Sequence, residues 1–291
     1  METAKTIIVI LKQILIFLLA GIAILIFSTT VYLIRPHPVK DESFSPIEAP
    51  VLIAHAGGAH HSGKDSNSKE AMNQAVTNGF KYIELDFRHA QNGEWVSIHD
   101  WEKSYLKYFS RFPRLPETLL DPARITPKTA ESFRKQYMRY NLTPMTFTNL
   151  APWLDENPDV RIITDIKDEN IAGLTALKKV MGGKLDQIIP QIYNMEEYEA
   201  VQAMGYTDTI FTAYKITLDE TKMSEFKKMK NLFALTVPKK WINEDINSLL
   251  PESAPQILTH TINDPSVAED LKAYGVSGFY TDYMIPVQLR K

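Results

Sequence analysis

The sequence predicts a (β/α)8 barrel of the TIM type, preceded by one transmembrane helix. An uncharged apolar run fills residues 14–34 near the N-terminus. From residue 51 onward, short apolar runs alternate with longer segments of helical periodicity, as in "MEEYEAVQAMGY", where Gly205 predicts the helix end. Strands that alternate with helices indicate a parallel sheet, and a long series of such units is typical of a closed barrel.

The run "ILIFLLAGIAILIFSTTVYLI" predicts a membrane anchor over residues 1–35. As a helix it spans about 30 Å, the thickness of a bilayer core. It is longer than the apolar part of most signal peptides and ends at Arg35-Pro36 without a clear cleavage signal. A cleaved signal peptide and a buried core helix remain the alternatives. The proline-rich stretch 36–50 predicts a linker, and residues 51–291 form the predicted barrel domain.

Charges around the apolar run give little information on orientation. Lys5 and Lys12 precede it, whereas Arg35 and Lys40 follow it. The two sides carry equal numbers of these positive charges, so the positive-inside rule does not decide the orientation. The short N-terminal tail and the large C-terminal domain favour a single-pass signal-anchor with an extracytoplasmic barrel.

Composition excludes several functions. The formal net charge is −3, and no dense basic tract occurs, so a nucleic-acid partner is not expected. The chain has no cysteine, which excludes disulfides, thiolate catalysis and cysteine-ligated zinc.

The sequence contains nine apolar runs that could form strands, one more than an eight-stranded barrel needs. They occupy residues 51–55, 82–87, 95–100, 161–167, 188–193, 209–214, 232–237, 257–262 and 278–283. Only seven residues separate the second run from the third, and they include Asn92-Gly93, a dipeptide typical of hairpins. One run can therefore be a hairpin partner outside the barrel. The long aromatic segment 101–154 predicts an insertion over the barrel mouth.

Polar residues gather at the carboxyl ends of the predicted strands, where barrels of this type place their chemistry. Glu84 and Asp86 are two residues apart and so share one face of a strand. Burying two carboxylates requires a positive partner, and a hard cation such as Ca²⁺ or Mg²⁺ meets that need. The alternative is an outward, half-exposed face of the strand.

His55 and His99 end two other strands. Either histidine alone is typical of a core or rim position, but together they suggest an acid–base pair around the carboxylates. Asp165 is a candidate third metal ligand. Lys167 shares its face and is a candidate to neutralise a carboxylate or bind an anionic substrate, with a structural salt bridge as the alternative.

At these residues the sequence resembles the glycerophosphodiester phosphodiesterase family, within the phospholipase C-like phosphodiesterases. The resemblance rests on "IAHAGG", "NSKEAMNQAVTNGFKYIELDF", "NGEWVSIHD", "DIK" and the closing "THTINDPSVAEDLKAYGVSGFYTD". It covers most of residues 51–286 and excludes the apolar run. It implies a TIM-type barrel that hydrolyses a phosphodiester with a divalent cation, Ca²⁺ or Mg²⁺. In that family a glycerol hydroxyl attacks phosphorus, and water opens the resulting cyclic phosphate.

Carried over by position, the resemblance makes His55 and His99 the acid and base. It implies metal ligation by Glu84, Asp86 and Asp165 and substrate binding by Lys167.

The chain departs from the family pattern at Ala56, where the family has an arginine that contacts phosphate. Arg88, Lys64 and Lys167 are candidates to compensate. We expect a metal-dependent phosphodiesterase that converts a glycerophosphodiester to glycerol 3-phosphate and an alcohol. The alternatives are phospholipase-type cleavage of a membrane lipid and a non-catalytic relative that binds phosphorylated glycans.

Overall fold

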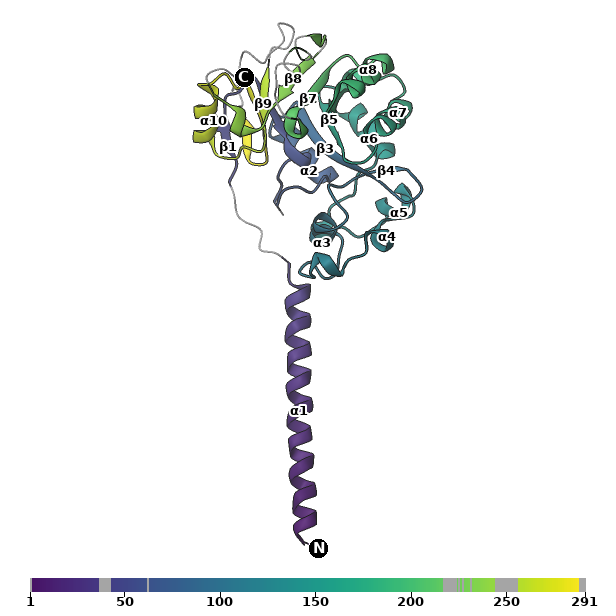
Figure 1. Ribbon diagram of the computed structural model, residues 1–291, viewed down its shortest axis with the longest axis vertical. Helices are drawn as coiled ribbons and strands as arrows, with labels where there is room; N and C mark the ends of the chain where they lie inside the picture. The colour runs from purple at the N-terminus through teal and green to yellow at the C-terminus, as the bar shows by residue number, and fades with distance from the viewer. Residues whose placement is uncertain are drawn as a thin grey trace.

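A long N-terminal helix extends from a barrel domain in the computed structural model of the chain (Figure 1). The structure describes residues 2–36, 43–61, 63–216, 224, 226, 228–230, 232–243 and 256–287. Helix α1 (Glu2–Ile34) contains an exposed apolar stretch, Leu11–Ile34, with a mean hydropathy of 2.7. This stretch is long and apolar enough to cross a membrane, and it is not buried against the barrel.

Eight parallel strands close into a barrel, as predicted. They are β2 (Val51–Ala54), β3 (Tyr82–His89), β5 (Arg161–Ile166), β6 (Ile188–Ile192), β7 (Thr209–Thr212), β8 (Leu232–Thr236), β9 (Ile257–Thr259) and β10 (Gly278–Thr281). Pairing of β2 with β3, through Ile53↔Tyr82 and Ala54↔Ile83, completes the ring.

The third apolar run, residues 95–100, forms a hairpin with β3, which resolves the excess of candidate strands. Strand β4 (Trp95–Ser97) pairs antiparallel with β3, with Phe87 opposite Ser97 and His89 opposite Trp95. Gly93 in the connecting turn has a φ of +83°, which glycine adopts without strain. His99 and Asp100 therefore follow β4 in a loop rather than ending a barrel strand.

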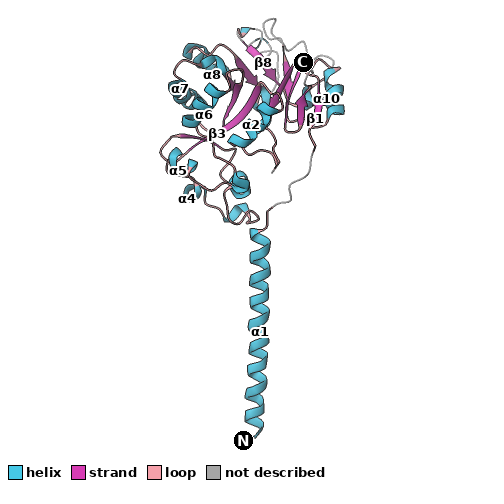
Figure 2. Ribbon diagram, turned by 180° about the vertical axis from the view of Figure 1, so that it is seen from behind, coloured by secondary structure: helices cyan, strands magenta, loops and turns pink. Residues whose placement is uncertain are grey.

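Helices cover the outside of the barrel (Figure 2). They are α2 (Lys69–Thr77), α6 (Phe147–Glu156), α7 (Asn170–Met181), α8 (Met195–Met204) and α10 (Pro265–Lys272). The Ser68 hydroxyl caps α2 by accepting from Ala71 N, and Gly205 ends α8 in the left-handed conformation, as its sequence predicts. The main apolar core lies between these helices and the outward faces of the strands.

Residues 101–145 connect β4 to α6, and we call them the insertion. It contains α3 (Lys103–Tyr108), α4 (Pro122–Ile125) and α5 (Ala130–Arg134). Figures 1 and 2 both place these short helices between the barrel and the near end of α1. The rest of the predicted insertion, residues 147–154, lies in α6, where Phe147, Leu150 and Trp153 join the barrel core.

Two short strands and several 3-10 turns complete the described structure. Strand β1 (Ser45–Ile47), inside the stretch expected as a linker, pairs in parallel with β11 (Met284–Pro286) and buries Ile47. The 3-10 turns are His55–Gly57, Glu117–Leu119, Arg139–Asn141, Leu185–Gln187, Ala213–Lys215 and Lys239–Trp241.

Candidate active site

The inward-facing positions of the strands change from apolar to polar at their carboxyl ends. The barrel interior is filled by one apolar cluster, made of Val51, Ile53, Ile163, Ile189, Ile210, Ala234, Leu258 and Tyr280. Because side chains on a strand alternate between faces, the residue two positions further on continues the inward row. His55 follows Ile53 in this way, and Asp165 follows Ile163. The alternation therefore directs these polar groups to the mouth of the barrel.

Three carboxylates meet inside that mouth. Glu84, Asp86 and Asp165 have ligand atoms that all lie within 4.8 Å of one another. Glu84 and Asp86 are only 2% and 1% exposed, so the alternative of an outward, half-exposed face is wrong. Asp86 and Asp165 are opposite each other in the β3–β5 ladder, which brings their side chains together.

Backbone and amide donors hold two of these carboxylates in place. Glu84 Oε2 accepts from Ala56 N at 2.6 Å. Asn67 Nδ2 donates to Asp86 Oδ2, and Asp86 N donates back to Asn67 Oδ1, both at 2.9 Å. Ala56 has a φ of +48° and Asn67 a φ of +52°, so both adopt the left-handed conformation. The turns after β2 are thus bent to aim donors at the carboxylates.

Lys167 is the cation nearest to this cluster. Its Nζ lies 2.8 Å from Asp86 Oδ1 and 2.6 Å from Asp165 Oδ2. Tyr193 donates its hydroxyl to the other Asp165 oxygen at 2.5 Å. The sequence offered Lys167 as a neutralising group or a substrate ligand, and its contacts here are with the carboxylates.

The charges in the cluster are unequally compensated. Burial and the neighbouring Asp86 raise the pKa of Glu84 to about 8. Burial alone raises the pKa of Asp86 as well, but Lys167, His99 and His55 together outweigh burial and hold this pKa below its usual value. The cluster therefore carries more negative charge than its lysine offsets. Carboxylate oxygens are the donors that Ca²⁺ and Mg²⁺ prefer, so this donor set fits a hard divalent cation.

His55 is held at the mouth by a second acidic group. Its Nδ1 donates to Asp282 Oδ1 at 2.8 Å and lies 3.6 Å from Asp65 Oδ1. Lys64 Nζ and Asn263 Nδ2 donate to the other Asp282 oxygen, at 2.7 and 2.8 Å. This contact directs Nδ1 to the Asp282 carboxylate, so any proton transfer by His55 would use Nε2.

The acidic surroundings change the pKa of His55. Burial alone lowers it, but the hydrogen bond to Asp282 and the charge of Glu84 raise the pKa to about 10. The same hydrogen bond lowers the pKa of Asp282 to about 2, against the effect of burial. Glu84 and Asp86 contribute to the His55 shift, so a cation bound between them would offset part of this rise in the His55 pKa.

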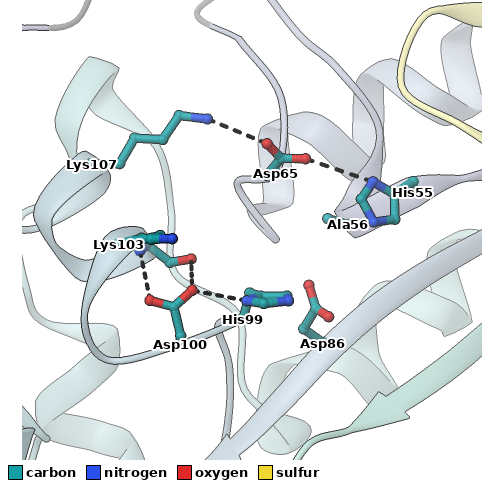
Figure 3. Close-up of a pocket in the computed structure, with 9 residues that line it drawn as sticks. His55, Ala56, Asp65, Asp86, His99, Asp100, Lys103 and Lys107 are labelled. Carbon is teal, nitrogen blue, oxygen red and sulfur yellow. Dashed lines mark hydrogen bonds and ion pairs between the residues drawn. The ribbon is translucent and has the colours of Figure 1, made fainter. Parts of the chain in front are cut away.

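His99 is positioned by its neighbour Asp100. His99 Nδ1 lies 2.8 Å from Asp100 Oδ2, and this hydrogen bond raises the pKa of His99. Asp100 Oδ1 also accepts from Glu102 N and Ser104 N, both at 3.0 Å. Asp100 therefore joins His99 to the start of α3. Figure 3 shows the His99 ring between the Asp100 and Asp86 carboxylates.

The two histidines line one pocket of about 280 Å³. Its walls are His55, Ala56, Asp65, Asp86, His99, Asp100, Lys103, Ser104 and Lys107 (Figure 3). The structure thus brings all six predicted site residues to one barrel mouth. His55, Asp86 and His99 line the pocket, whereas Glu84, Asp165 and Lys167 are connected to it through the Asp86 cluster.

Sequence reasoning missed the part of the wall that comes from α3. Lys103 and Lys107 are one helical turn apart and both line the pocket. Lys107 Nζ donates to Lys64 O at 2.8 Å and lies 3.6 Å from Asp65 Oδ2. The spacing of the two lysines was a visible signal, but only the fold shows that this helix closes over the mouth.

Each of the three cations proposed to compensate for Ala56 forms an ion pair with a carboxylate of the protein. Arg88 Nη1 pairs with Asp168 at 2.9 Å, and its Nε donates to His99 O. Lys64 pairs with Asp282, and Lys167 with the carboxylate cluster. On α3, Lys103 and Lys107 also line the pocket, and Lys107 itself lies 3.6 Å from Asp65 Oδ2.

Comparison with known proteins supports the same fold. No protein-family model matches the chain, and no curated protein matches it in sequence. Among solved structures, a glycerophosphodiester phosphodiesterase from Thermotoga maritima has a TM-score of 0.56 and 17% identity, covering 86% of this chain and 96% of that one. A second, from Parabacteroides distasonis, has a TM-score of 0.59 and 16% identity, covering 83% and 94%.

A third similar structure is a phosphodiesterase from Oleispira antarctica in complex with the product sn-glycerol-3-phosphate. Its TM-score is 0.59 and its identity 17%, covering 81% of this chain and 94% of that one. Identities at this level show a shared fold. The fold is thus similar to that of the glycerophosphodiester phosphodiesterases, the family that the sequence motifs resemble.

Proposed function

We propose that this protein is a metal-dependent phosphoric diester hydrolase that converts a glycerophosphodiester to glycerol 3-phosphate and an alcohol. The observation that carries the proposal is the meeting of His55 and His99 in one pocket beside the Glu84, Asp86 and Asp165 carboxylates. The fold shared with the phosphodiesterase that holds sn-glycerol-3-phosphate supports it.

The proposed division of labour follows from the chemistry of each group. Glu84, Asp86 and Asp165 would hold Ca²⁺ or Mg²⁺, and the bound cation supplies positive charge that offsets the charge developing on the phosphoryl oxygens. One histidine takes the proton of the attacking glycerol hydroxyl, and the other donates a proton to the leaving alcohol. Water then opens the cyclic phosphate with the two histidines in exchanged roles. Holding the hydroxyl beside phosphorus gives it a high effective concentration.

Lys103 and Lys107 are proposed to bind the phosphate. The resemblance places an arginine at the position of Ala56, and alanine offers no charge there. Both lysines line the pocket on the wall formed by α3. Ammonium groups attract a phosphate as point charges, without the bidentate fork of arginine. We therefore expect weaker orientation of the phosphate and a wider choice of leaving alcohol.

The membrane anchor belongs to the same proposal. The apolar stretch Leu11–Ile34 of α1 would hold the domain at a bilayer as a single-pass protein. An extracytoplasmic barrel remains a prediction from the arrangement of the chain. Phospholipase-type cleavage is the second candidate, because the anchor keeps the pocket near lipid.

The full chain in lipid nanodiscs, supplied with glycerophosphocholine, tests the proposal. We expect release of glycerol 3-phosphate with Ca²⁺ or Mg²⁺, loss of turnover in chelator, and recovery when the cation is restored. A matched diester with methylated glycerol hydroxyls controls for the attacking group and should not be cleaved. Lipid phosphodiesters in the same assay separate the phospholipase candidate. Turnover that survives chelation contradicts the metal site, and no turnover of any diester favours a non-catalytic binding protein.

A further inference from the structure

The insertion contacts the end of the apolar helix. Arg114 N donates to Leu33 O at 3.4 Å, and Arg114 Nε donates to Arg35 O at 3.0 Å. The Arg114 guanidinium lies 4.9 Å from the centre of the Tyr32 ring. These contacts join the insertion to the last turn of the apolar stretch. If α1 spans a bilayer, the segment around Arg114 lies at its surface.

The insertion differs in charge from the rest of the chain. Residues 101–145 contain nine Lys/Arg and four Asp/Glu, a formal charge of +5, whereas the whole chain has −3. Arg124 and Lys135 have 86% and 73% of the side chain accessible, and they pair with Asp121 and Glu131, which the net charge of the segment already counts. A surface of this sign is attracted to anionic lipid headgroups by about 1 kcal/mol per cation near the membrane.

Exposed apolar side chains lie in the same segment. Phe112 and Leu119 are 43% and 69% exposed, and they flank Arg114 in the chain. A further insertion residue, Tyr137, is 71% exposed. Aromatic and aliphatic groups beside cations are the composition of surfaces that enter the headgroup region.

We infer that the insertion is a membrane-binding surface that rests on an anionic bilayer where α1 emerges. Phe112 and Leu119 enter the headgroup layer, and the basic residues contact anionic lipids. Figures 1 and 2 show the insertion between α1 and the barrel, so the domain is held with this face toward the bilayer. Because α3 also forms a wall of the pocket, the mouth faces the headgroup layer. If the proposed function holds, this delivers lipid phosphodiesters to the pocket.

Site-specific labels in the full chain test the inference, because the chain has no cysteine of its own. Leu119→Cys carries a fluorophore in nanodiscs whose lipids bear a headgroup nitroxide quencher. Val180→Cys is the matched control, since Val180 is 40% exposed at the end of α7, away from the insertion. We expect anionic nanodiscs to reduce emission at residue 119 by roughly half, and at residue 180 by much less.

Lipid charge and salt separate the possible outcomes. Quenching at residue 119 should fall in nanodiscs of neutral lipid and at high ionic strength. Equal quenching at residues 119 and 180 overturns the inference, and so does quenching at 119 that is independent of lipid charge. Phe112→Cys is the second position if the first variant does not fold. The measurement needs no turnover, so its failure is distinct from failure of the proposed function.

Discussion

The two halves of the barrel mouth differ in charge. On the side of β2, β3 and β5 the inward positions end in His55, Glu84, Asp86, Asp165 and Lys167. On the side of β7 and β8 the inward positions are the buried hydroxyls of Thr212 and Thr236. Strands of both halves contribute to the same apolar cluster inside the barrel. The strands can therefore end in charged or in neutral polar residues, and the charged residues are buried where acidic and basic groups lie together.

The neutral half includes a histidine that makes the comparison direct. His260 follows β9 with its ring 6.4 Å from that of His55. Burial lowers the pKa of His260 to about 4, and the charge of His55 adds to the effect. His55 has Asp282 as a partner and its pKa is raised instead. Within the described part of the chain, His55 has a carboxylate at hydrogen-bonding distance and His260 has none, so the pKa values of these neighbouring histidines shift in opposite directions.

The largest expected effect is a loss of kcat when a histidine of the charged half is replaced, compared with the same replacement in the neutral half. His55→Gln should lower kcat for glycerophosphocholine by roughly 10²–10⁴-fold, since it removes one member of the proposed acid–base pair. His260→Gln should lower kcat by less than about tenfold, because His260 has no assigned proton transfer. Steady-state kinetics of both variants in nanodiscs, beside wild type, measure the difference. Comparable losses in the two variants would show that the halves act together.

A smaller effect concerns stability in the charged half. Glu84→Gln keeps an oxygen for the hydrogen bond from Ala56 N and removes a buried carboxyl whose raised pKa shows that its ionised form is costly in the folded state. In chelator we expect this variant to unfold at a higher temperature than wild type, with a gain of about 1–3 kcal/mol. Added Ca²⁺ or Mg²⁺ should raise the unfolding temperature of wild type only, because a ligand of the folded state stabilises it.

Thr212→Val is the matched control from the neutral half. It removes the hydrogen bond from Thr212 Oγ1 to Gln191 Oε1 (2.8 Å) and should lower stability by about 1 kcal/mol. It should keep the full response to cations. Thermal unfolding followed by tryptophan fluorescence, with and without chelator, compares the three proteins. A Glu84→Gln protein that is less stable than wild type in chelator would mean that Lys167 already balances the cluster.

The fold was predictable because its signals are local and repeated. Alternating apolar runs and helices identified the barrel, and Asn92-Gly93 identified the hairpin that removed one run from it. The inward alternation along β3 also predicted that Glu84 and Asp86 share a face. Each of these inferences depends only on residues that are close together in the sequence.

The support of the site was not predictable, because it depends on contacts between distant residues. Asp282 reaches His55 across 227 positions, and Asn67 fixes Asp86 from a left-handed turn. Asp282 lies in the last predicted strand, residues 278–283, but the sequence did not link it to a histidine. Likewise, Lys103 and Lys107 belong to a short helix whose position follows from the hairpin and Asp100. Pairing over such separations is set by packing of the whole barrel.

The smallest expected effect concerns His60, a buried histidine five residues after His55. Burial lowers the pKa of His60 to about 4, and the nearby charges of His61 and Lys107 act in the same direction. In the unfolded chain its pKa is 6.5, so below that pH the unfolded state binds a proton that the folded state does not. His60 therefore contributes stability that is complete above pH 6.5 and is lost as the pH falls toward 4.

Replacing this histidine isolates its share of the acid response. Between pH 6.5 and 4, wild type should lose up to about 1.4 kcal/mol per pH unit more than His60→Gln does, because glutamine does not titrate. Unfolding temperatures measured across this range in one detergent compare the two proteins, and the common titration of acidic groups cancels in the difference. Parallel curves for the two proteins would mean that His60 takes up its proton in the folded state as readily as in the unfolded chain. The acidic groups of the charged half would then also stabilise the protonated form of His60.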